Sequence, residues 1–195
     1  LGCDYKVTDL SKRESCKELA DYAIEKHGGV DILVNVAGIQ NVCPIEEFPE
    51  DKWDFMQALM LTAPFLMTKY CWTSMRERGY GRIINISSIW GVRGASCEVT
   101  YSCTKAALIA MSRSLALELA PTGIRVNCIA PGGFNPALTA NPDANPFVKT
   151  YIENCPLGCW ANEDDIKGPV VFLASEAANY VTGATLVMDG GWTIW

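Results

Sequence analysis

The chain has 195 residues, of which 49% are hydrophobic and 19% charged, and its formal net charge is −6. That is enough apolar material for one sizeable core, so we expect a single domain over residues 1–195. Acidic and basic residues are interspersed, which argues against a nucleic-acid partner because phosphate backbones are bound by clustered basic residues.

Neither a membrane span nor a leader is expected. The longest uncharged stretch, 55–68, contains Pro64 and is shorter than the ~20 residues that cross a bilayer. The start, LGCDYKVTDL, has no basic region followed by an apolar run. Nine cysteines without a CxxC pair predict free, mostly buried thiols, no metal site and a cytoplasmic location. A redox pair of Cys155 and Cys159 is the alternative.

Helix-like and strand-like patterns alternate from the start of the chain. Residues 11–29 open with Ser11 and Glu14 in capping-box spacing, carry an apolar stripe and end at Gly28, which predicts a helix. VDILVNVAG (30–38) is a short apolar run rich in β-branched residues, which predicts a strand buried on both faces. A long helix is expected over 49–78, bent near Pro64.

The alternation continues in the second half. GRIINISS (81–88) predicts a second buried strand, followed by a helix from Tyr101 to about Ala120 and a third strand at IRVNCIAPGG (124–133). Repeated Asn-Pro pairs interrupt residues 134–156, and so long a connection predicts a substrate loop. Helix returns at 162–183 and strand at 183–192. This order predicts an α/β fold with a doubly wound parallel sheet.

Tyr101 and Lys105 lie four residues apart in TYSCTK, so their side chains share one helix face. Such a pair alone is usually a surface pair, but Ser88 ends a predicted strand thirteen residues before Tyr101. A nearby ammonium lowers the pKa of a phenol from about 10, and a serine hydroxyl can hydrogen-bond a substrate oxygen. Asn35, Ser88 and Pro131 all follow predicted strands, where open α/β sheets bind ligands. We therefore expect a catalytic crevice there.

Several motifs follow one another in a fixed order: LVNVAG, INISS, YSCTK, IRVNCIAPGG, and GPVVFLAS with YVTGATLVMDGGW. They resemble, from about Val7 onward, the motifs of the short-chain dehydrogenase/reductase family. Their sequences are most similar to those of gluconate and deoxygluconate dehydrogenases. The resemblance implies a Rossmann-like fold and an oxidoreductase that uses NAD or NADP. It also implies interconversion of an alcohol and a carbonyl on a sugar acid or another small polar substrate.

The resemblance also implies roles for individual residues. Tyr101 matches the general acid/base, Lys105 the residue that lowers its pKa and binds the nicotinamide ribose, and Ser88 the serine that polarises the substrate. Ser87 is expected to be a neighbour of Ser88 rather than the catalytic serine. The positions implied to line the cofactor are Val7, Asn35, Ala37, Gly38, Ile86, Tyr101, Lys105, Pro131 and Gly132.

A homodimer or homotetramer is implied as well. Relatives pair the two long helices across one interface and pack a second interface near the end of the chain, where Trp192 and Trp195 stand. Large aromatic side chains at such a position often mark an interface. The alternative is that both tryptophans cover the core of their own chain.

Some positions depart from the family's pattern. No GxGxxG or GxxxGxG turn occurs, which predicts a domain without its first βαβ portion of ~30 residues or more. Lys6 stands where an acidic or amide residue is usual, and Val36 replaces the second asparagine of NNAG. Met60 and Pro136 replace the relay asparagine and the threonine that binds the nicotinamide amide. A shortened, non-catalytic relative that serves as a binding or assembly module is therefore the alternative.

Overall fold

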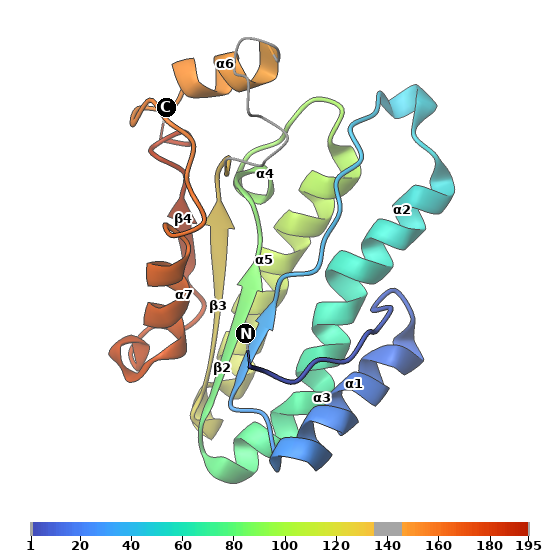
Figure 1. Ribbon diagram of the computed structural model, residues 1–195, viewed down its shortest axis with the longest axis vertical. Helices are drawn as coiled ribbons and strands as arrows, with labels where there is room; N and C mark the ends of the chain where they lie inside the picture. The colour runs from blue at the N-terminus through green and yellow to red at the C-terminus, as the bar shows by residue number, and fades with distance from the viewer. Residues whose placement is uncertain (1, 135–145, 195) are drawn as a thin grey trace.

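A four-stranded parallel sheet forms the centre of the molecule (Figure 1). The computed structural model describes residues 2–134 and 146–194. Within them the strands are β1 (Ile32–Asn35), β2 (Gly81–Ile86), β3 (Ile124–Pro131) and β4 (Thr185–Met188), in the order β1-β2-β3-β4. The three pairings are all parallel. Parallel neighbours need crossover connections, so the alternation of strand and helix predicted from the sequence is confirmed.

Helices cover both faces of this sheet. Ile83 and Ile84 are adjacent in β2 and therefore point to opposite faces. Ile83 packs in a buried cluster with residues of α1 (Arg13–His27), α3 (Ala63–Arg78) and α5 (Val99–Leu119). Ile84 packs with Leu173 and other residues of α7 (Lys167–Ala174). Figure 1 shows α7 on one side of the sheet and α3 on the other, so the doubly wound architecture is confirmed.

The strands differ in burial according to their place in the sheet. β2 and β3 are central, and nearly all of their side chains are buried, as their apolar sequences predicted. β1 lies at the edge of the described sheet, where its strand partner is β2, and Ile32 is 45% exposed. The prediction that β1 is buried on both faces is therefore wrong, because an edge strand is flanked on one side only.

Helix α1 begins later than the capping-box spacing predicts. Lys12 occupies the N-cap position in place of Ser11, and the helix starts at Arg13. Ser11 Oγ donates to Asp9 Oδ1 at 2.6 Å, so a local turn uses the hydroxyl that would have capped the helix. The predicted end is confirmed, since Gly28 takes a left-handed φ of 74° at the C-cap.

The long helix expected over residues 49–78 contains an irregular turn. It consists of α2 (Glu50–Gln57), a π-helical turn at Ala58–Thr62, and α3. Pro64 has no N–H, so the carbonyl of Met60 lacks the donor that an α-helix would supply four residues later. The disturbance predicted near Pro64 therefore takes the form of a π-turn, and such turns are frequent at functional sites.

The chain is less regular outside these elements. α6 (Pro146–Glu153) lies within the predicted loop 134–156, of which residues 135–145 fall outside the described residues. Of the helix predicted over 162–183, the structure shows α7 and a 3-10 turn at Glu176–Ala178. Other short elements are α4 (Ile89–Val92) and 3-10 turns at Ile45–Glu47 and Ala120–Thr122. Across 2–134 and 146–194, no helix is both long and apolar enough to cross a bilayer.

The nine cysteines are all free thiols, including Cys155 and Cys159. Cys16, Cys71, Cys128 and Cys155 are buried, and the other five are partly or fully exposed, so the expectation of mostly buried thiols is wrong. In the part of the chain that the structure describes, no group of His, Cys, Asp and Glu side chains could hold a metal ion.

Candidate active site

The carboxyl ends of β2 and β3 open into a cavity of about 320 Å³. Most of the predicted site residues meet here: Ser88, Tyr101 and Lys105 of the proposed catalytic set, with Gly38, Ile86, Pro131 and Gly132 of the cofactor set. These residues come from four separate parts of the chain. The crevice expected from the strand ends is therefore present, and it gathers the polar groups that the sequence singled out.

Tyr101 and Lys105 stand in the first two turns of α5. Lys105 Nζ lies 5.5 Å from the centre of the Tyr101 ring, as the spacing of four residues predicted. The Lys105 side chain is only 3% exposed, and Nζ donates a 2.7 Å hydrogen bond to the carbonyl oxygen of Ile86. Burial lowers the pKa of Lys105 to about 8, because a dry site disfavours the charged ammonium.

The pKa of Tyr101 is shifted in the direction opposite to the expected one. Burial of the phenol raises it, a hydrogen bond with Ser88 lowers it in part, and the nearby Glu98 carboxylate raises it further. Lys105 directs its ammonium to the Ile86 carbonyl. In this arrangement desolvation is the largest influence on the phenol and outweighs its hydrogen bond with Ser88.

Ser87 and Ser88 have different partners after β2. Ser88 Oγ accepts a 3.2 Å hydrogen bond from the Trp90 N–H and so caps α4, and Ser88 lines the same cavity as Tyr101. Ser87 Oγ donates to the carbonyl oxygen of Lys105 at 2.8 Å. Ser87 lines this cavity too, but its hydroxyl fastens α5 to the end of β2, and of the two serines only Ser88 also lines the adjoining cavity.

Three predicted cofactor residues lie elsewhere. Asn35 Nδ2 donates to Asn85 Oδ1 at 2.8 Å, and Asn35 and Ala37 line a neighbouring cavity of about 200 Å³ on the other side of the β1 end. Val7 is 91% exposed and lines neither of these cavities. The structure thus leaves these three outside the cavity that holds Tyr101.

Met60 is close to the reacting groups. It is 1% exposed within the π-turn. A Cβ on Gly38 would lie 3.2 Å from Met60 Sδ and 3.6 Å from Lys105 Nζ, so Gly38 brings these two side chains together by having none of its own. A thioether is only a weak acceptor and cannot donate, so Met60 cannot replace the hydrogen bonds of the relay asparagine that the resemblance implies for this position. Pro136, the other departure noted in the sequence, lies outside the described residues.

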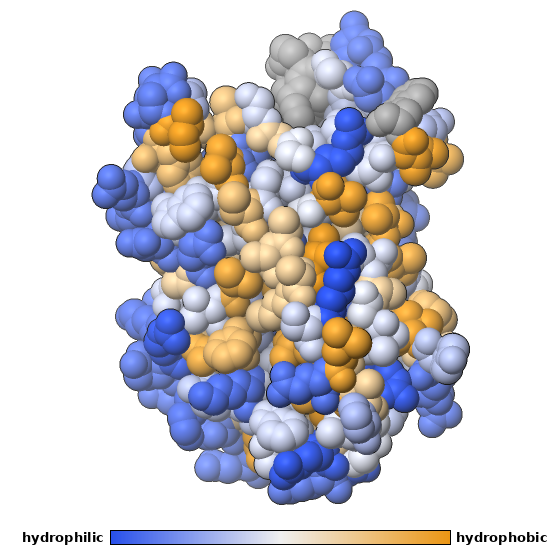
Figure 2. All heavy atoms as spheres, turned by 180° about the vertical axis from the view of Figure 1, so that it is seen from behind, coloured by the Kyte–Doolittle hydropathy of each residue, from blue (hydrophilic) through white to orange (hydrophobic). Residues whose placement is uncertain are grey.

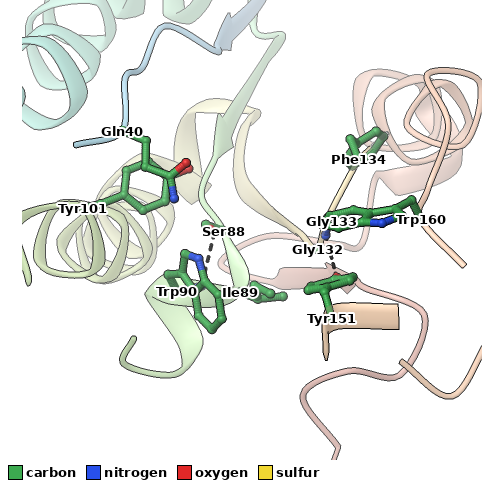
Figure 3. A pocket seen from close by; sticks show the side chains of 10 residues that line it. All are labelled: Gln40, Ser88, Ile89, Trp90, Tyr101, Gly132, Gly133, Phe134, Tyr151 and Trp160. Atoms are coloured by element: carbon green, nitrogen blue, oxygen red, sulfur yellow. Dashed lines mark hydrogen bonds between the residues drawn. The ribbon is translucent and has the colours of Figure 1, made fainter. Parts of the chain in front are cut away.

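A second cavity, of about 260 Å³, adjoins the first and shares Ser88, Tyr101 and Gly132 with it. Figure 3 shows that aromatic side chains form much of its wall. The lining residues are Gln40, Ser88, Ile89, Trp90, Tyr101, Gly132, Gly133, Phe134, Tyr151 and Trp160. Sequence reasoning missed Gln40, Trp90, Tyr151 and Trp160, although aromatics on both sides of the unusual segment 134–156 were a signal.

The aromatic wall is held in place by close contacts. Tyr151 and Trp160 stack with ring centres 4.2 Å apart, and Tyr151 also stacks on Trp192 at 5.7 Å. Gly133 N–H donates to the Tyr151 hydroxyl at 2.5 Å. A Cβ on Gly133 would overlap the Trp160 ring at 1.7 Å, so this wall requires glycine after Gly132.

Trp192 has a different role from the one expected at an interface. Its ring meets Trp90 edge-on at 5.0 Å and packs against the buried cluster of Ile89, Tyr151 and Cys155. The alternative that it covers the core of its own chain is therefore the one that the structure supports. Trp195 lies outside the described residues.

Known proteins match almost the whole chain. The family model described as enoyl-(acyl carrier protein) reductase matches residues 1–193. A 2-dehydro-3-deoxy-D-gluconate 5-dehydrogenase from Bacillus subtilis is 39% identical over 94% of this chain and 72% of its own length. A D-beta-hydroxybutyrate dehydrogenase from Cupriavidus necator is 36% identical over 96% of this chain and 77% of its own.

Solved structures agree with these sequence relatives. A gluconate 5-dehydrogenase from Burkholderia cenocepacia, in complex with NADP and tartrate, superposes with a TM-score of 0.90 at 31% identity, over 96% of this chain and 74% of that one. A 4-hydroxyisoleucine dehydrogenase complexed with NADH gives a TM-score of 0.89 at 31% identity, over 96% of this chain and 78% of that one. On the fold, the gathered site residues and these matches, the chain belongs to the short-chain dehydrogenase/reductase family of NAD(P)-dependent oxidoreductases.

Proposed function

We propose that this chain interconverts an alcohol and a carbonyl on a small polar substrate, with Tyr101 as the general acid/base. The observation that carries the proposal is the meeting of Ser88, Tyr101 and Lys105 in one cavity at the carboxyl ends of the strands. The names of the Bacillus and Burkholderia relatives suggest a sugar acid, and another small polar substrate, such as a neutral polyol, is the alternative to test beside it.

The protein groups supply proton transfer and positioning. The Tyr101 hydroxyl gives a proton to the carbonyl oxygen in reduction and removes one from the alcohol in oxidation. Ser88 Oγ, bonded to Tyr101, donates a hydrogen bond to the same substrate oxygen and orients it. NAD or NADP, when bound, supplies or accepts the hydride. Aromatic side chains around the second cavity exclude water from this exchange.

The cavity that holds Lys105 fits the nicotinamide end of the cofactor. Lys105 Nζ presents an ammonium for the ribose hydroxyls, with Gly38, Ile86, Pro131 and Gly132 around it. With a cofactor bound, the Lys105 cation, 5.5 Å from the centre of the Tyr101 ring, would also favour the phenolate form of Tyr101. Asn35, Ala37 and Val7 are proposed to contact more distant parts of the cofactor.

A fluorescence titration of the purified chain with NADH and NADPH tests the proposal. We expect saturable binding of at least one of them, followed by turnover of an alcohol. A Lys105→Met chain should bind more weakly, because the ribose loses its cation. A folded chain that binds neither nucleotide would contradict the proposal and favour a non-catalytic binding or assembly module.

We also propose that segment 134–156 is a substrate loop. Phe134 at its start and Tyr151 in α6 both line the cavity beside Tyr101, which supports the proposal at its two described ends. Residues 135–145 lie between them. Substitution of Tyr151 by Phe should change KM more than kcat, because it removes the hydroxyl that accepts from the Gly133 N–H in the cavity wall and leaves the proton-transfer groups in place.

A homodimer or homotetramer in the cytoplasm completes the proposal. Figure 2 shows apolar side chains gathered in a band down the middle of one face. Large apolar residues are exposed on the helices α2, α3 and α5, and a second group is exposed on α7 and β4. Two such groups fit two interfaces between copies of the chain. The free cysteines support a reducing compartment.

A further inference from the structure

Glu98 is a buried acid with half of its carboxylate unpartnered. It stands at the N-cap of α5, three residues before Tyr101, and is 5% exposed. Gln40 Nε2 donates to Glu98 Oε1, but no group in the described residues donates to the buried Oε2. Burying such an oxygen without a hydrogen bond is costly. The second oxygen therefore suits a donor that arrives from outside the chain.

Glu98 lines a space that continues the proposed substrate site. A cavity of about 660 Å³ has Glu98 in its wall and shares Gln40 and Trp90 with the cavity that contains Tyr101. Trp192 lines it as well. Gln40 and Tyr101 line the same cavity (Figure 3). A substrate with its reacting carbon at Tyr101 can thus extend toward Glu98.

Among the described residues that line these two cavities, the other unpartnered polar groups are donors, and the unpartnered hydroxyls of Thr100 and Ser102 line neither cavity. The indole N–H groups of Trp160 and Trp192 are buried and have no acceptor among the described residues. One free acceptor and two free donors therefore surround the connected space. A hydroxyl group can serve both kinds, since it donates and accepts. A carboxylate can only accept, and an ammonium can only donate.

The charge of the site opposes a carboxylate. No lysine, arginine or histidine of the described residues lines either cavity, and segment 135–145 contains none in its sequence. Arg93 lies over the Trp192 ring, 5.5 Å from its centre. Burial already raises the pKa of the Glu98 carboxyl, because a dry site disfavours its charge. A substrate carboxylate beside Glu98 would add a second negative charge, with no lysine, arginine or histidine among the described lining residues to balance it.

We infer that Glu98 is a specificity-determining residue, which selects a neutral polyhydroxylated alcohol and rejects substrates that carry a carboxylate. Its free oxygen accepts a hydrogen bond from a hydroxyl remote from the reacting carbon, while Gln40 holds the other oxygen in place. This inference rests on the proposed function, because it concerns the far end of the same substrate. It separates this chain from relatives named for gluconate and hydroxybutyrate, which are anions.

Matched pairs of probes test the inference. D-Glucitol and D-gluconate differ only in a terminal hydroxymethyl or carboxylate group, and so do 1,3-butanediol and 3-hydroxybutyrate. Binding is followed by intrinsic tryptophan fluorescence, to which Trp90 and Trp192 in the cavity wall contribute, in the absence and presence of NAD and of NADP. Values of kcat/KM are measured separately with each cofactor. We expect the neutral member of at least one pair to bind more tightly by roughly tenfold or more, as like charges at short range require.

Variants then assign the preference to the carboxylate. Glu98→Gln keeps the shape of the side chain and removes its charge, so the affinities of the two members of each pair should come to within about threefold of each other. Glu98→Lys should favour the carboxylate member. Glu118→Gln, an exposed position on the same helix, should keep the preference of the original chain. Arg93→Gln should also keep it.

The outcomes separate the inference from the function on which it rests. A preference that disappears in Glu98→Gln, without turnover of any probe, would support the inference and contradict the proposed reaction. Turnover with no difference between the members of a pair would overturn the inference alone. Tighter binding of the carboxylate members would also overturn the inference. So would a result in which none of the four probes binds saturably.

Discussion

Tyr101 is the residue on which the proposed chemistry depends most directly. Its hydroxyl lies against Ser88, and a phenylalanine in its place would keep the ring while removing the proton. We expect Tyr101→Phe to lower kcat by about 10²–10⁴, the usual contribution of a positioned acid or base, with little change in the affinity for the nucleotide. Substantial remaining turnover in a steady-state assay would contradict the assignment.

Lys105 should make stability depend on pH. Its pKa is about 8 in the folded chain against 10.5 in an unfolded one. Below pH 8 both states carry the charge, and burial costs about 3 kcal/mol. Between pH 8 and 10.5 the unfolded state holds more protons, so stability rises with pH. Lys105→Met should be the more stable chain at pH 7, and this advantage should shrink by pH 10.

Urea unfolding of the two chains at pH 7, 9 and 10 measures this difference. Groups that titrate equally in both chains, such as Cys71, cancel in the comparison. The lost hydrogen bond to Ile86 lowers the advantage of the methionine variant at every pH but does not change its slope. Curves that stay parallel from pH 7 to 10 would mean that Lys105 is not desolvated.

The meeting of Ser88, Tyr101 and Lys105 in one cavity could be predicted because each belongs to a motif with a fixed place relative to a strand or helix. Ser88 follows β2, and Tyr101 and Lys105 share a face of α5. The direction of the Tyr101 pKa could not be predicted, since it depends on burial and on the Ile86 carbonyl that binds Lys105. Glu98 and Gln40 were missed because nothing in their local sequence shows that they meet.

The contact between α4 and α5 fixes the geometry of the site at the level of elements. A Cβ on Gly91 would lie 2.6 Å from Ser87 Oγ and 2.7 Å from the carbonyl carbon of Lys105. Gly91→Ala must therefore push α5 away from the end of β2 and break the bond between Ser87 and Lys105. We expect a loss of about 1–3 kcal/mol in the free energy of unfolding, measured by urea denaturation.

Gly94→Ala is the matched control, because a Cβ there meets no heavy atom within 4 Å. It should unfold at nearly the same urea concentration as the unchanged chain. An equal loss in both variants would show that the backbone freedom of glycine matters here rather than the close approach of α4 to α5.

Helices and strands with a clear apolar pattern were predicted well, but the residues at which they begin and end were predicted less well. β2, β3 and α5 lie where their apolar patterns place them. The start of α1 was displaced because Asp9 competes for Ser11. The burial of β1 was overestimated because its sequence does not state which strands flank it. A missing N–H at Pro64 signalled a disturbance, but not that it would become a π-turn.

At the scale of the whole molecule, the chain exposes two kinds of surface through which copies of it can associate. One is the apolar helix face with Phe65 on α3, and the other is the edge of β1 with Ile32. We expect Phe65→Glu to convert a defined oligomer to monomers, because it places a charge in the helix interface. Ile32→Lys should instead reduce larger, ill-defined aggregates, since a lysine protects an open strand edge.

Light scattering coupled to size-exclusion chromatography, over a range of concentrations, separates the two effects. The unchanged chain should elute as a discrete dimer or tetramer, with aggregate that increases with concentration. An oligomer that persists in Phe65→Glu would place the interface elsewhere, for example on α7 and β4.

Apart from Trp90, the stacked aromatic residues of the wall and the proton-transfer groups come from different parts of the chain. Ser88, Tyr101 and Lys105 lie within eighteen residues of one another, whereas Tyr151, Trp160 and Trp192 come from the last third. Their mutual stacking makes the wall a unit that can be exchanged as a whole. Changes in the last third can therefore reshape the wall around a substrate without altering the proton-transfer groups, whereas Glu98, proposed to recognise the far end of the substrate, would be inherited together with those groups.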